Sequence, residues 1–329
     1  FNVCIFAYGQ TGSGKTHTMF GPTSAAPLFG DADELAVESG LAPRAAVELF
    51  KVLREREESY SYTVEVNMFE LYNDKIIDLL AISRGVPSQA LRVKLAEHCE
   101  SGLVEVDGAM TEEVSDAQGL LDIFTKGTKI RSTAATRMNA DSSRSHLIIS
   151  IVMKMVKKKT GCVTSGKLTL CDLAGSERVG KSGSEGRQLK EAQSINKSLS
   201  ALNGVINSLT TGSRHIPYRN HPLTMLMSDS MGGNSKTLMF VCCSPEDDNC
   251  AESTNSLEFA KRCKNVTNIV KPTAGDIIQI KKLKAEVARL KKQQYETLKK
   301  NRTSTLSPTV QQLTQNSIST ISKRVLGHS

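Results

Sequence analysis

The sequence predicts an α/β fold in which a central mixed sheet carries helices on both faces. Strand-like and helix-like hydrophobic patterns alternate along most of the chain, and two strand-like segments, 146–158 and 165–173, are joined by the short turn Lys159–Gly161. Of the 329 residues, 39% are hydrophobic and 23% are charged, and no apolar run approaches the roughly 18 residues of a membrane span. Membrane enzymes and fibrous proteins are therefore excluded.

Each predicted element rests on the spacing of its apolar residues. Alternating or continuous apolar residues predict strands at 2–8, 62–72, 146–158, 165–173 and 236–243. Apolar residues three and four positions apart predict helices at 36–58, 115–132, 188–210, 224–230 and 254–270. Together these elements predict one layered domain over residues 1–270.

The positive charge is concentrated in the last part of the chain. Residues 271–329 hold 12 Lys or Arg and 3 Asp or Glu, whereas residues 1–270 hold 30 and 31. An apolar stripe of Ile280, Leu283, Val287 and Leu290 among lysines predicts a basic amphipathic helix within 271–300. The polar residues 301–329 are predicted to form a disordered tail. A neutral body with a basic appendage indicates local contact with an acidic partner rather than binding of nucleic acid.

The cysteines indicate the redox compartment of the protein, and the first residue indicates where in the fold the sequence begins. The eight cysteines form no C-x-x-C pair, which predicts reduced, mostly structural thiols in an intracellular protein. The sequence opens at Phe1 inside a predicted strand, without an initiator Met or signal-peptide features. We therefore expect that it begins inside a fold.

A glycine-rich motif follows the first predicted strand. Residues 9–16, Gly-Gln-Thr-Gly-Ser-Gly-Lys-Thr, fit the pattern G-x-x-x-x-G-K-[ST] in the strand-to-helix context that it requires. Backbone N–H groups and the start of the next helix would hold phosphate oxygens, while Lys15 adds a charge and Thr16 a hydroxyl ligand for Mg²⁺. A glycine-rich turn without a ligand is the alternative, and the flanking strand argues against it. The motif predicts a P-loop NTPase whose nucleotide is bound by Gly9, Gln10, Thr11, Gly12, Ser13, Gly14, Lys15 and Thr16.

A second motif, Asp172-Leu-Ala-Gly175, follows another apolar strand. Asp172 lies where strands of open α/β sheets meet their ligands, so it can serve as the carboxylate on the metal side. Gly175 can offer a backbone N–H to a γ-phosphate. Without a P-loop, this Asp and Gly would indicate only a turn.

A third segment, 139–146, is a polar loop that leads into a strand. The hydroxyls of Ser142 and Ser143 can sense a γ-phosphate, and Arg144 can pair with a carboxylate such as Glu177. A serine-rich turn is the alternative. A guanine-binding relative would carry Asn-Lys-x-Asp, which this sequence lacks. The motifs therefore favour ATP and Mg²⁺ as ligands.

Five motifs occur in a characteristic order: AYGQTGSGKTHTM at 7–19, NADSSRSH at 139–146, DLAGSER at 172–178, INKSLSAL at 195–202 and HIPYRNHPLT at 215–224. In these motifs the sequence resembles kinesin motor domains over residues 1–270. Residues 223–249 resemble the kinesin-14 group, especially the kinesin-like calmodulin-binding proteins. The resemblance implies a partial kinesin head, a microtubule-stimulated ATPase that converts ATP to ADP and phosphate, and a place on the microtubule cytoskeleton of the cytoplasm.

The resemblance also implies roles for single residues. Residues 142–146 are similar to switch I and residues 172–177 to switch II, with Arg144 and Glu177 as the ion pair that closes the switches and orders the attacking water. The implied catalytic residues are Ser142, Ser143, Arg144, Gly175 and Glu177. The implied metal ligands are Thr16, Ser143 and Asp172. The helix from Asn196 is similar to the relay helix, which carries the nucleotide state to the microtubule track. The residues expected to face the acidic tubulin surface are Lys181, Arg187, Lys190, Tyr218 and Arg219.

The sequence departs from the family pattern in two respects. Kinesin heads have strands, a helix and an Arg-x-Arg-Pro adenine contact before the P-loop strand, so this head is expected to be N-terminally truncated. Pro222 stands where many members carry a lysine that contacts the track. A homodimer formed through regions outside the sequence is left open, and so is the direction of movement.

Two alternatives to a motor were weighed. A non-motile microtubule anchor or crosslinker is disfavoured because the P-loop and both switch motifs are intact. A nucleic-acid-stimulated ATPase is disfavoured by the neutral body and by an aromatic content of only 5%. The basic helix at 276–300 keeps two interpretations: a neck helix, or a binding segment for calmodulin or a related calcium sensor, which the resemblance favours.

Overall fold

The computed structural model describes residues 2–22, 35–87, 89–99, 101–138, 142–178, 187–268 and 283–296. The chain divides into two compact units, Phe1–Val270 and Lys271–Ser329. In the second unit, the described residues 283–296 form a helix, and the predicted tail 301–329 lies outside the described residues. No helix in the described part of the chain is long and apolar enough to cross a membrane.

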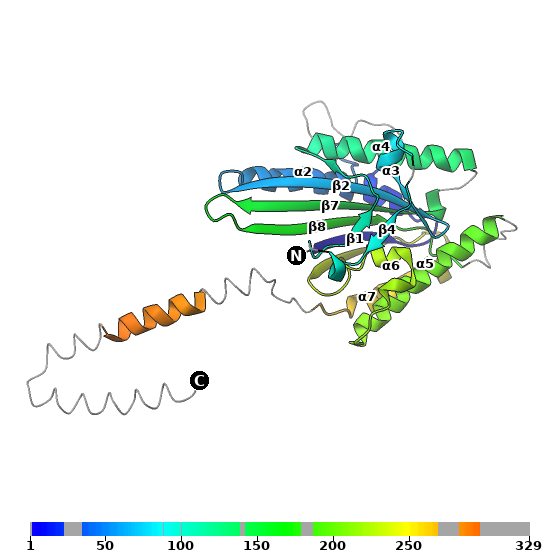
Figure 1. Ribbon diagram of the computed structural model, residues 1–329. Coiled ribbons are helices and arrows are strands. Elements are labelled where there is room, and N and C mark those ends of the chain that lie inside the picture. Colours follow the sequence, from blue (N-terminus) through cyan, green and yellow to red (C-terminus); the bar gives the residue numbers. More distant parts are fainter. Residues whose placement is uncertain are drawn as a thin grey trace, which may run out of the picture. The chain divides into compact units, whose positions relative to one another are not determined.

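Within the described residues, the first unit is built on a seven-stranded sheet in the order β3-β2-β7-β8-β1-β9, with β6 also paired to β2 (Figure 1). The strands are β1 (Asn2–Tyr8), β2 (Tyr60–Tyr72), β3 (Lys75–Asp78), β6 (Glu112–Glu113), β7 (His146–Lys157), β8 (Val163–Asp172) and β9 (Ser235–Val241). β1 runs parallel to β8 and β9, and the remaining pairs are antiparallel. The predicted central mixed sheet is confirmed.

The register of the sheet brings three loops to one end. Asp172, the last residue of β8, lies beside Ala7 near the end of β1 and beside Leu147 near the start of β7. The segments that follow β1, follow β8 and precede β7 therefore meet. In open α/β sheets, ligands bind at this end of the parallel strands.

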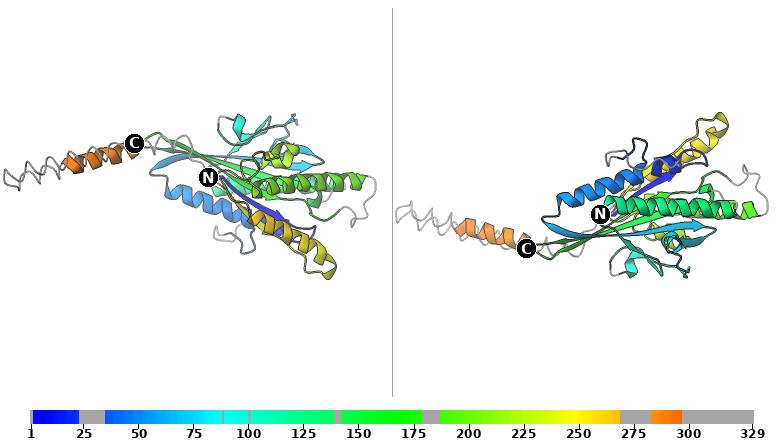
Figure 2. Two further views of the ribbon diagram at one scale, coloured as in Figure 1. Left: turned by 90° about the horizontal axis from the view of Figure 1, so that it is seen from below. Right: turned by 90° about the horizontal axis from the view of Figure 1, so that it is seen from above.

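Helices cover both faces of the sheet, as predicted (Figure 1 and Figure 2). One face carries α1 (Lys15–Phe20), α2 (Leu41–Glu55), α3 (Leu79–Ser83) and α4 (Ala117–Met138), and the other carries α5 (Arg187–Thr210), α6 (Pro222–Leu226) and α7 (Cys250–Lys264). Because strand side chains alternate, Leu147 and Ile149 join the core on the first face, and Ile148 joins the core on the second.

Several short elements were not predicted from the sequence. β3, α3 and a separate two-stranded sheet of β4 (Arg92–Lys94) and β5 (Glu105–Asp107) lie between the predicted strand 62–72 and helix 115–132. None exceeds five residues. A hydrophobic period cannot be recognised over so short a length.

The bounds of the predicted helices also differ from the structure. α6 and α7 each begin and end earlier than the predicted 224–230 and 254–270. α2 begins at Leu41, not at 36, because Gly40 packs so closely on α1 that a Cβ there would lie 2.4 Å from the backbone nitrogen of Phe20. α4 continues to Met138 rather than ending at 132. There the hydroxyls of Ser132 and Thr133 each donate to the Lys129 carbonyl at 2.9 Å, so these polar residues are accommodated within the helix.

The turn between β2 and β3 fastens two helices to the sheet. Its residue Asp74 has a positive φ of 61° and accepts hydrogen bonds from Ser194 and Lys197 of α5. It also bonds, at 3.0 Å, to His221, which caps the N-terminus of α6. Burial opposes ionisation of Asp74, but the hydrogen bonds outweigh it and lower its pKa to about 2. The charged carboxylate therefore holds α5 and α6 to this turn at neutral pH.

The eight cysteines are free. Cys4, Cys171 and Cys242 are buried, whereas three others are exposed: Cys162, Cys243 and Cys250. Only part of the set is therefore packed in the core, fewer than the sequence analysis expected.

Candidate active site

The glycine-rich motif forms a loop between β1 and α1. Gly9, Gly12 and Gly14 have positive φ angles of 155°, 78° and 94°. A Cβ on Gly9 would lie 2.1 Å from the carbonyl oxygen of Cys242 and 2.8 Å from the Ser13 hydroxyl. Only glycine fits this position, and the left-handed turns at Gly12 and Gly14 favour glycine as well.

Lys15 is buried at the start of α1. Its ammonium group donates to the carbonyl oxygen of Gln10 at 2.7 Å, across the loop. Burial lowers the pKa of Lys15, an effect that the negative charges of Asp172 and Glu177 oppose. A buried cation next to a glycine-rich turn is the arrangement that binds phosphate oxygens.

The three predicted loops are bonded directly to one another. The backbone N–H of Gly175 donates to the carbonyl oxygen of Ser143 at 2.9 Å, and the N–H of Ser176 donates to the carbonyl oxygen of Gly9 at 3.0 Å. The loop after β8 therefore lies between the glycine-rich loop and the loop before β7. A movement of one loop therefore displaces the other two.

Asp172 and Thr16 form an oxygen-rich corner of the site. The Thr16 hydroxyl donates to Asp172 Oδ2 at 2.7 Å, while Asp172 Oδ1 is buried and has no hydrogen-bond partner among the described residues. Oxygen ligands suit Mg²⁺, which takes only one or two carboxylates from the protein and completes its shell with phosphate and water. The described residues contain no group of three or more acidic, His or Cys side chains that could cage a metal. The corner fits Mg²⁺ held jointly with phosphate.

A buried arginine that the sequence analysis did not single out completes this corner. Arg131 of α4 donates to Asp172 Oδ2 at 2.9 Å and to the Ser145 carbonyl at 2.8 Å. The Ser145 hydroxyl in turn donates to Glu70 of β2 at 2.6 Å. Arg131 and both carboxylates are at most 8% exposed. The network therefore ties Asp172 to α4, to β2 and to the residue that precedes β7.

The expected ion pair between Arg144 and Glu177 is not formed in this structure. Arg144 donates to Glu191 of α5 at 2.7 Å. Glu177 instead accepts from the backbone N–H of Thr11 at 2.8 Å and from its hydroxyl at 2.5 Å. Arg144 is therefore bonded to α5, and Glu177 is bonded to the glycine-rich loop. Of the two serines before Arg144, Ser143 contributes its carbonyl to the loop contact above, and the side chain of Ser142 lies outside the described residues.

His146 links the site to α5. Its Nδ1 accepts from the Ala174 backbone N–H at 3.0 Å, so the ring proton lies on Nε2, which donates to the Ser198 hydroxyl at 2.7 Å. Burial, with the nearby positive charges of His221 and Arg131, lowers the pKa of His146 to about 3. The ring is therefore neutral at physiological pH and keeps this single orientation.

Known proteins are similar to this chain in sequence. The family model described as the kinesin motor domain matches residues 1–266. This chain belongs to the kinesin motor domain family. It is 48% identical over 288 residues to the kinesin-like protein KIN-14E of Arabidopsis thaliana, a match that covers 87% of this chain and 21% of the relative. The chain thus spans about a fifth of the length of this curated kinesin.

Solved kinesin structures share the fold. A structure of a fast kinesin matches with 41% identity and a TM-score of 0.71, covering 82% of this chain and 72% of that one. The motor domain of Kar3 from Saccharomyces cerevisiae matches with 38% identity and a TM-score of 0.66, covering 80% and 75%. The P-loop NTPase fold of a kinesin head is confirmed. The KIN-14 and Kar3 relatives agree with the kinesin-14 resemblance of residues 223–249.

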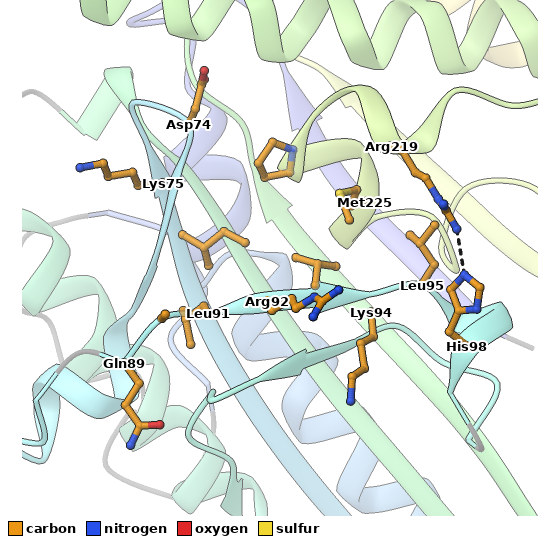
Figure 3. Close-up of a pocket in the computed structure, with 14 residues that line it drawn as sticks. Asp74, Lys75, Gln89, Leu91, Arg92, Lys94, Leu95, His98, Arg219 and Met225 are labelled. Carbon is orange, nitrogen blue, oxygen red and sulfur yellow. Dashed lines mark hydrogen bonds between the residues drawn. The ribbon is translucent and has the colours of Figure 1, made fainter.

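A second feature of this kinesin head is a pocket of about 890 Å³ between β3, β4, α6 and the short helix Tyr218–Asn220. Figure 3 shows Arg219 reaching to His98 at one side of this pocket, over a distance of 2.8 Å. Other cationic residues line it: Lys75, Arg92 and Lys94. The acidic Asp74 at its margin is already bonded to α5 and His221. The pocket is therefore rich in positive charge.

Three of the five residues predicted to contact tubulin can be placed in this kinesin head: Lys190 on α5, and Tyr218 and Arg219 on the short helix Tyr218–Asn220. Arg219 is exposed and donates to Glu97 at 3.0 Å, and Lys190 is exposed near the start of α5. Tyr218 instead donates its hydroxyl to the Met231 carbonyl, and its pKa is raised to about 12, mainly by burial. Lys181 and the side chain of Arg187 lie outside the described residues.

Arg131 could have been identified from the sequence, whereas Glu70 and Glu191 could not. Arg131 continues the buried stripe of α4 formed by Leu120 and Phe124, and a charge on such a stripe indicates a buried partner. The roles of Glu70 and Glu191 depend on contacts with residues 47 to 75 positions away. No local pattern could have identified them.

Proposed function

We propose that this chain is the head of an ATP-driven microtubule motor, which hydrolyses ATP and changes its affinity for tubulin as it does so. The observation that carries the proposal is the direct bonding of the P-loop, switch I and switch II through Gly175 to Ser143 and Ser176 to Gly9. A γ-phosphate held by the P-loop would reach both switches at once.

The nucleotide would be held by Gly9, Gln10, Thr11, Gly12, Ser13, Gly14, Lys15 and Thr16. Lys15 supplies the charge that the phosphates need, and Thr16 with Asp172 would hold Mg²⁺, with Ser143 joining them when switch I closes. Bound Mg²⁺ neutralises phosphate charge during transfer. The absence of an Asn-Lys-x-Asp guanine reader favours ATP over GTP.

In the proposed hydrolysis, Arg144 and Glu177 act on the attacking water. Glu177 would accept or relay its proton, Arg144 would orient Glu177, and Ser142 would help to position the water. The N–H of Gly175 would meet the γ-phosphate. Since Glu177 is now held by Thr11 and Arg144 by Glu191, both contacts must be exchanged before the pair can form.

The proposed track surface consists of Arg219, Lys190, Lys181 and Arg187, with Tyr218 fixing the position of Arg219. Tubulin is acidic at its surface, so cations around the pocket at β4 and α6 suit it. Such contacts would bring the chain to cytoplasmic microtubules. A homodimer through regions outside this sequence is compatible with the proposal.

Microtubule-stimulated ATPase activity is the first prediction. Phosphate release from ATP should be slow with the chain alone and at least about tenfold faster with polymerised tubulin, since Glu191 and Ser198 connect α5 to Arg144 and His146 of the active site. The measurement is steady-state phosphate release with increasing polymerised tubulin, and unpolymerised tubulin serves as the control. Tight microtubule binding without any hydrolysis would instead support the non-motile anchor.

The basic helix of the second unit has a further proposed partner. In the described part, 283–296, Leu283, Val287 and Leu290 are each 50–57% exposed on one side of the helix. An exposed apolar stripe among lysines fits the groove and acidic rim of a calcium sensor such as calmodulin. We therefore propose that residues 276–300 bind calmodulin or a related sensor.

Calcium-dependent complex formation tests this partner. The full chain should co-elute with calmodulin in calcium and separate from it in a chelator, with a Kd of about 1 μM or below. Leu283→Glu and Val287→Glu should abolish co-elution, whereas Glu296→Gln, on the side of the helix opposite the apolar stripe, should not. No calcium-dependent co-elution at micromolar concentration would support the neck-helix interpretation.

A further inference from the structure

Arg144 is held by a buried acid of the relay helix. Its guanidinium donates to Glu191 Oε2 at 2.7 Å, and the side chain of Arg144 is 26% exposed while that of Glu191 is 2% exposed. The other oxygen of Glu191 accepts from the Tyr72 hydroxyl at 2.6 Å. Both carboxylate oxygens are therefore bonded, one to switch I and one to the end of β2.

Glu191 belongs to a bonded face at the start of α5. One turn further, Ser194 donates to Asp74 at 2.7 Å, and one turn beyond that, Ser198 accepts from His146. Residues three and four positions apart lie on the same side of a helix. The orientation of Glu191 is therefore set by the orientation of α5 as a whole.

We propose that Glu191 is a positioning residue that holds Arg144 away from Glu177 until α5 moves. This inference rests on the proposed function, because it assigns to Glu191 the regulation of the same site. In this structure Arg144 is bonded to Glu191 while Glu177 is bonded to Thr11, so the ion pair between Arg144 and Glu177 is not made while Glu191 holds the guanidinium. Glu191 therefore competes with Glu177 for Arg144, and the position of α5 decides the competition.

This competition explains how a microtubule bound far from the nucleotide would accelerate ATP hydrolysis. While α5 keeps this orientation, Arg144 stays on Glu191, and Glu177 stays on Thr11. A displacement of α5 withdraws Glu191 from Tyr72 and Arg144, and the released guanidinium can then turn to Glu177. Microtubule binding would favour that displacement through contacts near Lys190.

Glu191→Gln tests the proposal, because the amide keeps the shape of the side chain but loses the charge that retains Arg144. We expect the ATPase rate without microtubules to rise at least about fivefold, while the rate at saturating microtubules stays within about twofold. The stimulation by microtubules should fall accordingly. A merely structural role would lower both rates together with the melting temperature.

Two further variants complete the experiment. Glu48→Gln makes the same chemical change at an exposed acid of α2, which pairs with Lys51 at 3.5 Å, and its microtubule-free rate should be unchanged. Tyr72→Phe removes the hydrogen bond from the Tyr72 hydroxyl to Glu191 and should raise the microtubule-free rate by a smaller factor. This variant tests the proposal if Glu191→Gln does not fold. An unchanged or lower microtubule-free rate in the folded variants, with an active wild type, would overturn the proposal. An inactive wild type would contradict the proposed function itself.

Discussion

Glu177→Ala is expected to lower the microtubule-stimulated turnover by about 100- to 10,000-fold, the usual contribution of a positioned proton-transfer group. Nucleotide affinity should change little, because Glu177 is assigned to the attacking water and not to the phosphates, and it leaves Thr11 before it pairs with Arg144. The measurements are the turnover rate at saturating microtubules and the Kd for a fluorescent ATP analogue.

Lys15→Ala is the matched variant, and it is expected to weaken nucleotide binding itself. Removing a buried cation that can bond phosphate oxygens should weaken nucleotide binding by roughly 10- to 100-fold. The two variants thus separate phosphate binding from the activation of water. Equal losses of nucleotide affinity in both would show that this division of roles is wrong.

Arg131→Met is expected to destabilise the head by about 3–5 kcal/mol, because it leaves the buried carboxylates of Asp172 and Glu70 without their cation. Denaturant unfolding followed by circular dichroism gives the free energy. Arg131→Lys should be intermediate, since one ammonium group cannot reproduce the separate bonds of a guanidinium to Asp172 and to the Ser145 carbonyl.

A surface arginine provides the control for Arg131. Arg84 pairs with Glu112 at 3.0 Å, and its side chain is 60% exposed. Arg84→Met should therefore change the free energy of unfolding by less than about 1 kcal/mol. Comparable losses in the two methionine variants would contradict the importance of burial for Arg131.

The sequence predicted those parts of the fold that depend on local patterns. β1 was predicted with its observed bounds, and the long pair β7 and β8 was predicted to within two residues at each end, because long apolar strands around a Gly-containing turn leave a clear pattern. The P-loop and switch motifs fixed which loops would form the site. The parallel pairing of β1 with β8 and β9 depended on contacts that no local period encodes.

The partners of the switch residues could not be read from the motifs. Arg144 and Glu177 were both identified, but the motif carries no information on which of two carboxylates the arginine contacts in a given state. That choice depends on Glu191 and Tyr72, which lie 47 and 72 residues from Arg144. The same holds for Arg131, whose partners lie on three separate elements.

The bonded face of α5 would give the proposed motor a threshold. Glu191, Ser194, Lys197 and Ser198 all hold one rigid helix, so a rotation that breaks one of their bonds strains the others at the same time. If each bond contributes about 1 kcal/mol, the rotated helix is disfavoured by roughly a thousandfold until something at the track compensates for all four. Weak or partial encounters with a filament would then leave the nucleotide untouched, and ATP would be consumed only when docking is complete.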